Sequence, residues 1–510
     1  MNNLDTSNSN NYEYLTKHLE IHVLGGIKTN KLESLRVTVS IQKLKSNNIL
    51  RHSIDLYNDN QLEKFVRKIA ERLEIGTSAV RKTLQELTKE LEAYRFLLLD
   101  KQEQENKAYY KTLNATEEKE AIDFLKEGNL LKRTNEYIGK SGVIGEDINR
   151  LLMYLIFTSR KTNNPLHCIS LGSSGAGKTH LQSKVAELIP EEDKIEITVL
   201  SANAFYYFNR TELHNKLVLI EDLDGAESVL YPLRELQSKK RITKTVVHKD
   251  ARGNTKTIHL TVEGPVSVAG CTTQESIYED NSNRSFLLYI DESSEQDKRI
   301  MNYQRRASAG NLNEQDEIDS RELLKDVQRV LKSIKVINPF AEHLELPQSV
   351  FKPRRTNSHY LQFIEAITFY KQYQREQQVN KETGEVFIET TIEDIEEANE
   401  IITEMLLRKS DTISGACRNY LEKLKRYLFI ENQTTYTSTE IRRNLRIKET
   451  TLRRYHSQLI EEGYIKKVKG KKGQMYHYEV VDLQEYKSLK ETISKVLQNC
   501  ISKINLATSP

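Results

Sequence analysis

The stretch Gly172–Thr179 places glycines, a lysine and a threonine at the spacing of a phosphate-binding loop. GSSGAGKT matches G-x-x-x-x-G-K-[ST] in full and stands between an apolar run and a helical pattern. Glycines let successive backbone N–H groups curl around phosphate oxygens. Lys178 is expected to neutralise the β and γ phosphates, and Thr179 to reach Mg²⁺. The predicted ATP-binding residues are Gly172, Ser173, Ser174, Gly175, Ala176, Gly177, Lys178, Thr179 and His180.

Carboxylates follow a second apolar run, in KLVLIEDLDG, where Glu221, Asp222 and Asp224 stand close together. One carboxylate is expected to hold Mg²⁺ and a neighbour to polarise the attacking water. We expect Glu221 on the metal side and Asp222 beside the water, with Thr179 as a further metal ligand. The usual order in such enzymes is Asp then Glu, and the reversed order here leaves the two roles open. Solvated loop acids are the alternative.

A third apolar run, GPVSVAGCTTQ, ends in Thr272 and Thr273. Their hydroxyls stand where a sensor of the γ-phosphate would lie. Threonine is also common at strand ends for purely conformational reasons. Thr272 is therefore a candidate catalytic residue.

A basic segment, KTVVHKDARGNTKTIHL, alternates apolar and polar residues around a glycine turn and predicts a β-hairpin. From Lys239 to Lys256 it carries seven Lys/Arg and one Asp, a local charge of +6. Such charges suit sequence-independent, salt-sensitive contacts with nucleic-acid phosphates. Protection of a sheet edge is the alternative. The candidate DNA contacts are Lys244, His248, Lys249, Arg252 and Lys256.

Residues 436–475 form a second basic region, with eleven Lys/Arg and four Glu. Their pattern predicts a winged helix in which Ser438 or Thr439 caps the first helix and the wing turns at two glycines. A helix–turn–helix geometry places one helix toward a nucleic-acid groove or backbone. Winged helices also serve as protein–protein modules. The candidate contacts are Arg453, Arg454, His456, Lys469, Lys471 and Lys472.

The composition of the chain limits the classes of protein that can position these residues. The chain has 510 residues, 37% apolar and 29% charged, with a net charge of +3, so nucleic-acid affinity must come from local patches. Four cysteines without a C-x-x-C pair argue against disulfide or zinc frameworks and fit a reducing cytoplasm. The polar N-terminus does not resemble a signal peptide, and no apolar run is long enough to span a membrane.

The predicted fold class is α/β, a parallel sheet with helices on both faces, because short apolar runs alternate with longer helical patterns. An all-helical lid is expected after it. The predicted domains are a disordered tail (1–12), an α+β accessory domain (13–99), a linker (100–121), the nucleotide-binding core (122–340), the lid (341–408), the winged helix (409–482), and a C-terminal helix and tail (483–510).

The order of these motifs resembles an AAA+ ATPase over roughly residues 135–375, in the clade with a hairpin before the first sensor strand that includes the MCM helicases. The resemblance implies that Arg284, in SNRSF, is an arginine finger reaching a neighbouring subunit's ATP. It implies a second sensor at Arg354 or Arg355, between which the sequence does not choose. Ordinary surface arginines are the alternative. It also implies a homo-oligomer, a hexameric ring in that family.

The function expected from the residues and the resemblance together is that of a cytoplasmic, ATP- and Mg²⁺-dependent DNA helicase or translocase. It would be replicative, encoded by a phage or mobile element, and act on single-stranded or forked DNA, with a primase or other replication protein as a further partner. The alternative is an AAA+ DNA-binding switch or loader, such as an initiator, transposition or defence ATPase. A protein remodeller is a third interpretation.

Overall fold

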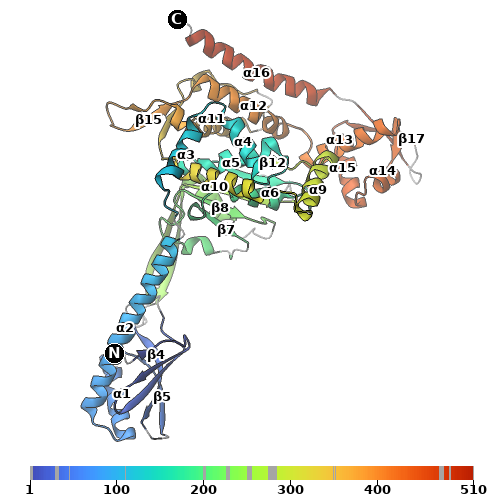
Figure 1. Cartoon of the computed structure of the whole chain (residues 1–510). Helices are drawn as coiled ribbons and strands as arrows, with labels where there is room; N and C mark the ends of the chain where they lie inside the picture. The colour runs from blue at the N-terminus through green and yellow to red at the C-terminus, as the bar shows by residue number, and fades with distance from the viewer. Residues whose placement is uncertain are drawn as a thin grey trace. The chain divides into compact units, whose positions relative to one another are not determined.

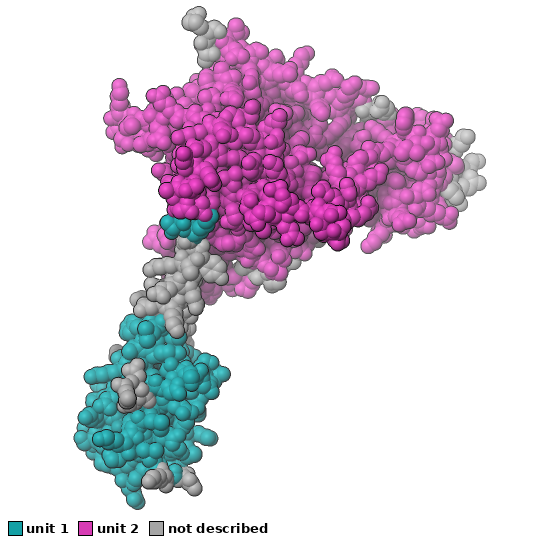
Figure 2. Space-filling model, viewed as in Figure 1, with its two compact units in different colours: residues 1–112 teal, residues 113–510 magenta. Residues whose placement is uncertain are grey.

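The chain forms two compact units, residues 1–112 and 113–510, which are treated separately (Figure 1, Figure 2). The structure is a computed structural model. It describes residues 4–28, 34–44, 46, 48–108, 111–198, 201, 203–224, 230–249, 255–273, 284–347, 350, 352–469, 476–481 and 484–508.

The first unit is an antiparallel sheet covered by two helices. Its strands follow one another in space as in sequence: β1 (Leu4–Asp5), β2 (Asn11–Leu15), β3 (Leu19–Leu24), β4 (Arg36–Lys43) and β5 (Ile49–Asp55). Alternate side chains along β2 and β3 are buried under α1 (Asp59–Leu73) and α2 (Thr77–Ala108), as a half-buried sheet requires.

Two predicted boundaries differ from the structure around this unit. Residues 1–12 were expected to be a disordered tail, yet β1 and the start of β2 lie within them, because Tyr12 and Tyr14 pack into the core. The expected linker, 100–121, includes the end of α2 and the start of α3 (Ala115–Lys126). Asn114 caps α3 and forms a capping box with Glu117, so an acidic, polar stretch encodes a helix start.

The centre of the second unit is a fully parallel five-stranded sheet, and the expected α/β core is confirmed. In chain order the strands are β6 (His167–Leu171), β7 (Lys194–Ile197), β8 (Lys216–Ile220), β11 (Val266–Thr272) and β12 (Phe286–Tyr289). In space they run β12-β6-β11-β8-β7, so the first strand lies between the last two. All carboxyl ends therefore meet at one edge and all amino ends at the other.

Helices cover both faces of this sheet (Figure 1). Cys168, Leu219 and Ala269 point to a face that packs on the larger helical layer, whereas Ile169 and Val268 point to the opposite face. The helices of the larger layer include α3, α4 (Leu130–Lys140), α5 (Asp147–Thr158), α6 (Lys178–Ala186), α10 (Glu314–Val330), α11 (Pro353–Tyr370) and α12 (Ile392–Lys409). The opposite face is covered by η3 (Ala204–Tyr207), α7 (Leu230–Lys239) and the base of a hairpin.

That hairpin consists of β9 (Arg241–Lys249) and β10 (Thr255–Glu263) and stands between α7 and β11. Its register runs from the Arg241–Glu263 pair at the base to the Lys249–Thr255 pair. Ile242 and Val262 are buried at the base and join the core, while the strands further out are largely exposed. The predicted hairpin is thus present; residues 250–254 lie outside the described ones.

The lid is not all-helical as expected. Between α11 and α12, the chain forms β14 (Gln378–Val379) and β15 (Val386–Glu389), and β15 also pairs with β13 (Lys335–Ile337), which precedes α11. The last helix, α16 (Glu485–Thr508), packs along α12 and buries Ile493, Leu497 and Ile504 in the same core as the sheet. Lid, terminal helix and nucleotide-binding core therefore share one hydrophobic core.

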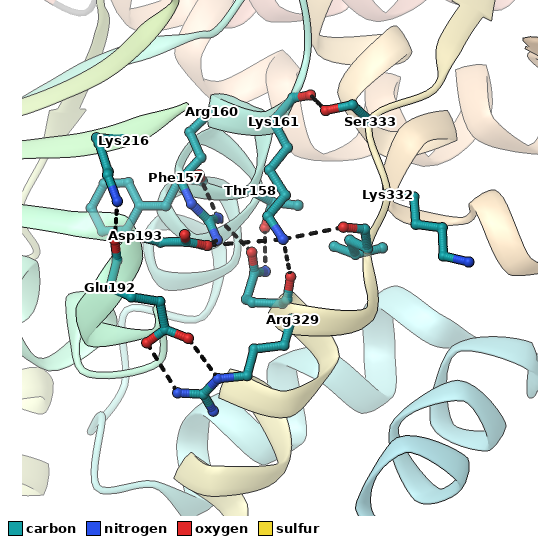
Figure 3. A network of polar contacts seen from close by, with 12 residues as sticks. Phe157, Thr158, Arg160, Lys161, Glu192, Asp193, Lys216, Arg329, Lys332 and Ser333 are labelled. Carbon is teal, nitrogen blue, oxygen red and sulfur yellow. Dashed lines mark hydrogen bonds and ion pairs between the residues drawn. The ribbon is translucent and has the colours of Figure 1, made fainter. Parts of the chain in front are cut away.

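A polar network ties the segment before β6 to α10 (Figure 3). The buried Arg160 guanidinium lies 2.5 Å from the Asp193 carboxylate and donates to Gln328 Oε1 at 2.6 Å. Arg329 pairs with Glu192 at 2.8 Å, and Lys161 donates to the Gln328 carbonyl. Both terminal nitrogens of the Arg160 guanidinium are thereby paired, as are Lys161 and Arg329, and these contacts hold α10 against the segment before β6.

The C-terminal part of this unit is a helical cluster with a three-stranded sheet. Thr437 caps α14 and forms a capping box with Glu440, so the expected cap at Ser438 or Thr439 was one or two residues late. Its elements are α13 (Gly415–Ile430), β16 (Thr435–Thr437), α14 (Ser438–Asn444), α15 (Glu449–Glu461), β17 (Ile465–Lys469) and β18 (His477–Val480). The winged-helix interpretation remains a prediction.

Across the described residues, no helix is both long and apolar enough to span a bilayer.

Candidate functional site

The predicted phosphate loop joins β6 to α6 at the carboxyl edge of the sheet. Gly175 and Gly177 have φ values of +82° and +93°, which only glycine adopts without strain. Gly177 is the N-cap of α6, so the helix N-terminus opens directly beneath the loop. Lys178 is 8% exposed, and its ammonium group donates to the carbonyls of Gly172 at 3.0 Å and Ser173 at 2.7 Å. The lysine thus lies folded against the loop that it is expected to serve.

A carboxylate already contacts this loop. The Ser173 N–H donates to Glu292 Oε1 at 2.7 Å, and the other Glu292 oxygen lies 3.5 Å from Lys423 of α13. The loop therefore presents a backbone donor to an anion, as a phosphate site must. Sequence reasoning missed Glu292, because an acidic residue three positions past a strand belongs to no motif.

The three carboxylates after β8 differ in their exposure to solvent and in their hydrogen bonds. Glu221 and Asp222 are exposed, whereas Asp224 accepts hydrogen bonds from both threonines that end β11. The Thr273 hydroxyl donates to Asp224 Oδ2 at 2.7 Å, and the Thr273 N–H donates to the same oxygen at 3.0 Å. The structure therefore connects the sensor-strand candidate Thr272 to Asp224 rather than to Glu221 or Asp222.

The environment of Asp224 keeps it ionised. Partial burial raises its pKa, but hydrogen bonds from Thr272 and Thr273 and the positive charge of Lys178 together hold that pKa below its ordinary value. The same charge of Lys178 links Asp224 electrostatically to the phosphate loop. Sequence reasoning noted Asp224 in the acidic run but gave it no role, because only the fold shows which carboxylate faces β11.

Thr179 and Asp222 both interact with the buried thiol of Cys271. Burial raises the pKa of Cys271 to about 11; a hydrogen bond with Thr179 and the charge of Lys178 oppose that shift, and Asp222 adds to it. Hydroxyl and carboxylate oxygens are the ligands that Mg²⁺ prefers, and Mg²⁺ typically takes one or two carboxylates plus phosphate oxygens. The predicted metal ligands Thr179, Glu221 and Asp222 thus fit Mg²⁺ in chemistry and in their place at this edge.

Two predicted arginines meet at the opposite edge. Arg284, just before β12, and Arg355, in the first turn of α11, line one cavity of about 300 Å³. The Arg284 Nε donates to Ser238 Oγ at 2.7 Å. His167, the first residue of β6, also lines this cavity, and burial lowers its pKa to about 3, so it is neutral. Arg354 is exposed and does not line the cavity.

The cavity is far from the chain's own phosphate loop. His167 begins β6 and Leu171 ends it, and five residues of extended strand span about 16 Å. The loop follows the carboxyl end of that strand, whereas the arginines gather at its amino end. Arg284 and Arg355 therefore belong to a second surface of the unit.

The candidate contacts of the hairpin are only partly described. The Lys244 ammonium donates to Asn203 Oδ1 at 2.6 Å and lies 5.4 Å from the Tyr206 ring centroid, which ties β9 to η3. The backbone pairs His248 with Lys256 and places Lys249 at the end of β9. Arg252 lies outside the described residues.

The candidate nucleic-acid contacts of the C-terminal region are also only partly described. Arg453 and Arg454 are exposed on α15, with Arg453 paired to Glu449 at 2.5 Å. His456 was expected to face a groove, and this is wrong: it is 5% exposed and lies 2.7 Å from the Tyr420 hydroxyl in an aromatic core. The helical period explains the difference, because His456 shares the inward face of α15 with Leu452 and Leu459. Lys469 ends β17; Lys471 and Lys472 lie outside the described residues.

One family model and two solved structures are similar to parts of this chain. A family model described as the MTBMA_p00010 P-loop domain matches residues 114–333, so the chain carries a P-loop domain. A full-length MCM homolog from Methanopyrus kandleri is similar at 14% identity and a TM-score of 0.37, covering 58% of this chain and 62% of that chain. Drosophila ORC bound to DNA is similar at 10% identity and a TM-score of 0.23, covering 77% and 94%.

These structural similarities are weak, and neither informs function. The chain spans less than two thirds of the MCM homolog's length. No curated protein matches the chain.

Proposed function

We propose that this protein is an ATP-driven DNA helicase or translocase whose subunits assemble into a ring. The observation that carries the proposal is the placement of the phosphate loop and the two arginines at opposite edges of one sheet. A cation that stabilises γ-phosphate charge must approach the nucleotide closely. Arg284 and Arg355 line a cavity at the amino end of β6, whereas the loop of their own chain follows the carboxyl end of this strand, which is about 16 Å long. They are suited to complete a neighbouring subunit's site.

Such a contact is head-to-tail: the carboxyl edge of one subunit meets the amino edge of the next. Repeated contacts of this kind close into a ring when the rotation permits. Arg284 and Arg355 share one cavity, so both enter the neighbouring site together, and Arg355 rather than Arg354 is the second sensor. The hexamer expected from the AAA+ resemblance is one such closed ring.

In the proposed reaction, the loop N–H groups and Lys178 bind the β and γ phosphates, and Thr179 and Glu221 or Asp222 hold Mg²⁺. The metal would neutralise charge that develops on the phosphoryl oxygens. A carboxylate at the end of β8 orients the attacking water. Asp224 holds Thr272 and Thr273 at the end of β11, so a change at the γ-phosphate reaches the hairpin, which leads directly into that strand.

DNA is the proposed substrate because the two most basic segments are the hairpin and the C-terminal region, both outside the nucleotide site. Six hairpins in a ring would concentrate their charge along one strand. Arg453 and Arg454 on α15, with the basic strand β17, would add a second contact. These contacts are with phosphates, so they carry no sequence preference.

The decisive experiment measures ATP hydrolysis with and without single-stranded DNA, together with strand displacement on forked duplexes of each polarity. We expect stimulation by single strands and ATP-dependent unwinding. A combined Lys249→Ala and Arg252→Ala variant should lose both, because it removes the charge nearest the hairpin tip.

Lys381→Ala with Lys495→Ala, which alters two lysines outside both basic segments, is the matched control and should behave as wild type. Hydrolysis that no nucleic acid stimulates would refute the motor. Stable ATP-dependent DNA binding without displacement would instead support the switch or loader.

A further inference from the structure

A cavity of about 350 Å³ opens at the base of the β9–β10 hairpin, and neither the nucleotide site nor the hairpin tip uses it. It lies where α7 and η3 meet the first residues of β9, and η3 packs against both hairpin strands. The side chains that define it are Tyr206, Tyr231, Glu235, Lys239 and Arg241. A cavity of this volume is within the range of small ligand sites.

Two tyrosines form the aromatic part of the wall. Tyr231 is 64% exposed, so most of its ring faces solvent at the mouth of the cavity. The Lys244 ammonium lies 5.4 Å from the centroid of the Tyr206 ring. Burial raises the pKa of Tyr206, and the neighbouring Tyr231 and Glu235 raise it further, which places the three groups around one space. Exposed rings at a cavity mouth indicate a ligand with an aromatic face.

The charged part of the wall favours an anion. The Arg241 side chain is 58% exposed, and its ion pair with Glu263 is long, at 3.9 Å. Glu263 already accepts from Arg210 at 2.8 Å, so Arg241 has capacity for another acceptor. Lys239 neutralises Glu235 across 2.6 Å, so the net positive charge of the cavity lining comes from Arg241. The adjoining hairpin is itself strongly basic.

We propose that this cavity binds one nucleotide of a single strand, with its base stacked on Tyr231 and its phosphate on Arg241. The inference rests on the proposed function and names its substrate: single-stranded rather than duplex nucleic acid. In a duplex both faces of each base are covered by its neighbours, so only an unpaired, unstacked base can lie on a tyrosine. Stacking tolerates any base, as a motor that moves along a strand requires.

The test measures binding of labelled oligothymidine to the full chain by fluorescence anisotropy in the presence of a non-hydrolysable ATP analogue. Tyr231→Ala should weaken binding roughly 5- to 100-fold, since one base–aromatic stack is lost per site. Tyr231→Phe keeps the ring and should bind as wild type. Tyr207→Ala is the matched control, because Tyr207 follows Tyr206 in η3 and is 69% exposed but does not line the cavity.

A strand of abasic residues adds an independent measurement. Wild type should bind it more weakly than oligothymidine, while Tyr231→Ala should bind both alike. If Tyr231→Ala keeps full affinity while Lys249→Ala with Arg252→Ala loses it, this inference is wrong and the DNA motor stands. If wild type binds no nucleic acid, both fail. If Tyr231→Ala weakens capture of an unfolded polypeptide but not of oligothymidine, the cavity binds peptide instead.

Discussion

At the scale of single residues, the acidic side chains after β8 make different contacts from one another. Glu221 and Asp222 occupy the expected end of β8, but Asp224 accepts the hydrogen bonds from β11. Because Asp224 contacts the two threonines at the end of β11, we expect it to act as a positioning residue. It couples the nucleotide edge to the strand that continues from the hairpin.

Asp224→Asn should lower kcat for ATP about 10- to 100-fold while KM changes little, because misplaced groups slow the chemical step more than binding. An amide replaces one of the two accepting oxygens with a donor, so Thr272 and Thr273 cannot both be held. Steady-state ATPase assays over a range of ATP concentrations measure the two constants.

Thr273→Ser supplies the control, because it retains the hydroxyl, and it should stay close to wild type. Thr273→Val removes the hydroxyl and should shift kcat in the direction of Asp224→Asn. A rise in KM at constant kcat would show instead that Asp224 binds nucleotide in the ground state.

At the scale of elements, the C-terminal helix cluster is held by an aromatic core around a neutral histidine. His456 packs against Tyr436 and Tyr478 and contacts the Tyr420 hydroxyl. Burial lowers its pKa to about 4. The basic side chains Arg453 and Arg454 are exposed on the same helix. The helix α15 thus carries both buried and exposed side chains.

The cluster should lose stability as the pH falls from about 6.5 to about 4. In that window the unfolded chain binds a proton at His456 and the folded chain does not, so the unfolded state is favoured as the pH falls. The contribution is at most about 3 kcal/mol. Hydrogen exchange of peptides from α13 to α15, corrected for intrinsic rates, measures it at several pH values.

His456→Gln remains neutral throughout and should flatten this pH dependence. The control His214→Gln changes an exposed histidine outside the cluster and should leave it unchanged. Equal slopes for wild type and His456→Gln would mean that another group governs acid sensitivity here.

At the scale of the whole molecule, the proposed function builds a complete ATPase site from two copies of the chain. The second unit exposes the loop at one edge of its sheet and the arginines at the other, on one continuous core that includes the lid and α16. The first unit has a separate core, and no function is assigned to it.

Mixing two inactive variants tests this arrangement. Lys178→Ala lacks a working loop and Arg284→Ala lacks the finger, so each alone should hydrolyse ATP poorly. A random mixture contains interfaces with an intact loop and an intact arginine, and should recover about a quarter of the wild-type rate. Titration of one variant against the other, with ATPase as the readout, gives the curve.

Lys178→Ala combined with Arg284→Ala in the same chain is the control, and mixing it with either variant should restore nothing, since no interface then carries both groups. Full activity of Arg284→Ala by itself would refute action in trans.

The sequence alone determined the local features: the phosphate loop, the apolar strands, the hairpin and the α/β class. Each depends on residues close in the chain, such as Gly175, Gly177 and Lys178, whose backbone demands are visible in their types. The tertiary structure decided which distant groups meet. It placed Asp224 on Thr272 and Thr273, joined Glu292 to the loop, put Arg355 but not Arg354 in the cavity that Arg284 lines, and buried His456. Those outcomes depend on strand order and packing between segments tens to hundreds of residues apart, which local propensity does not encode.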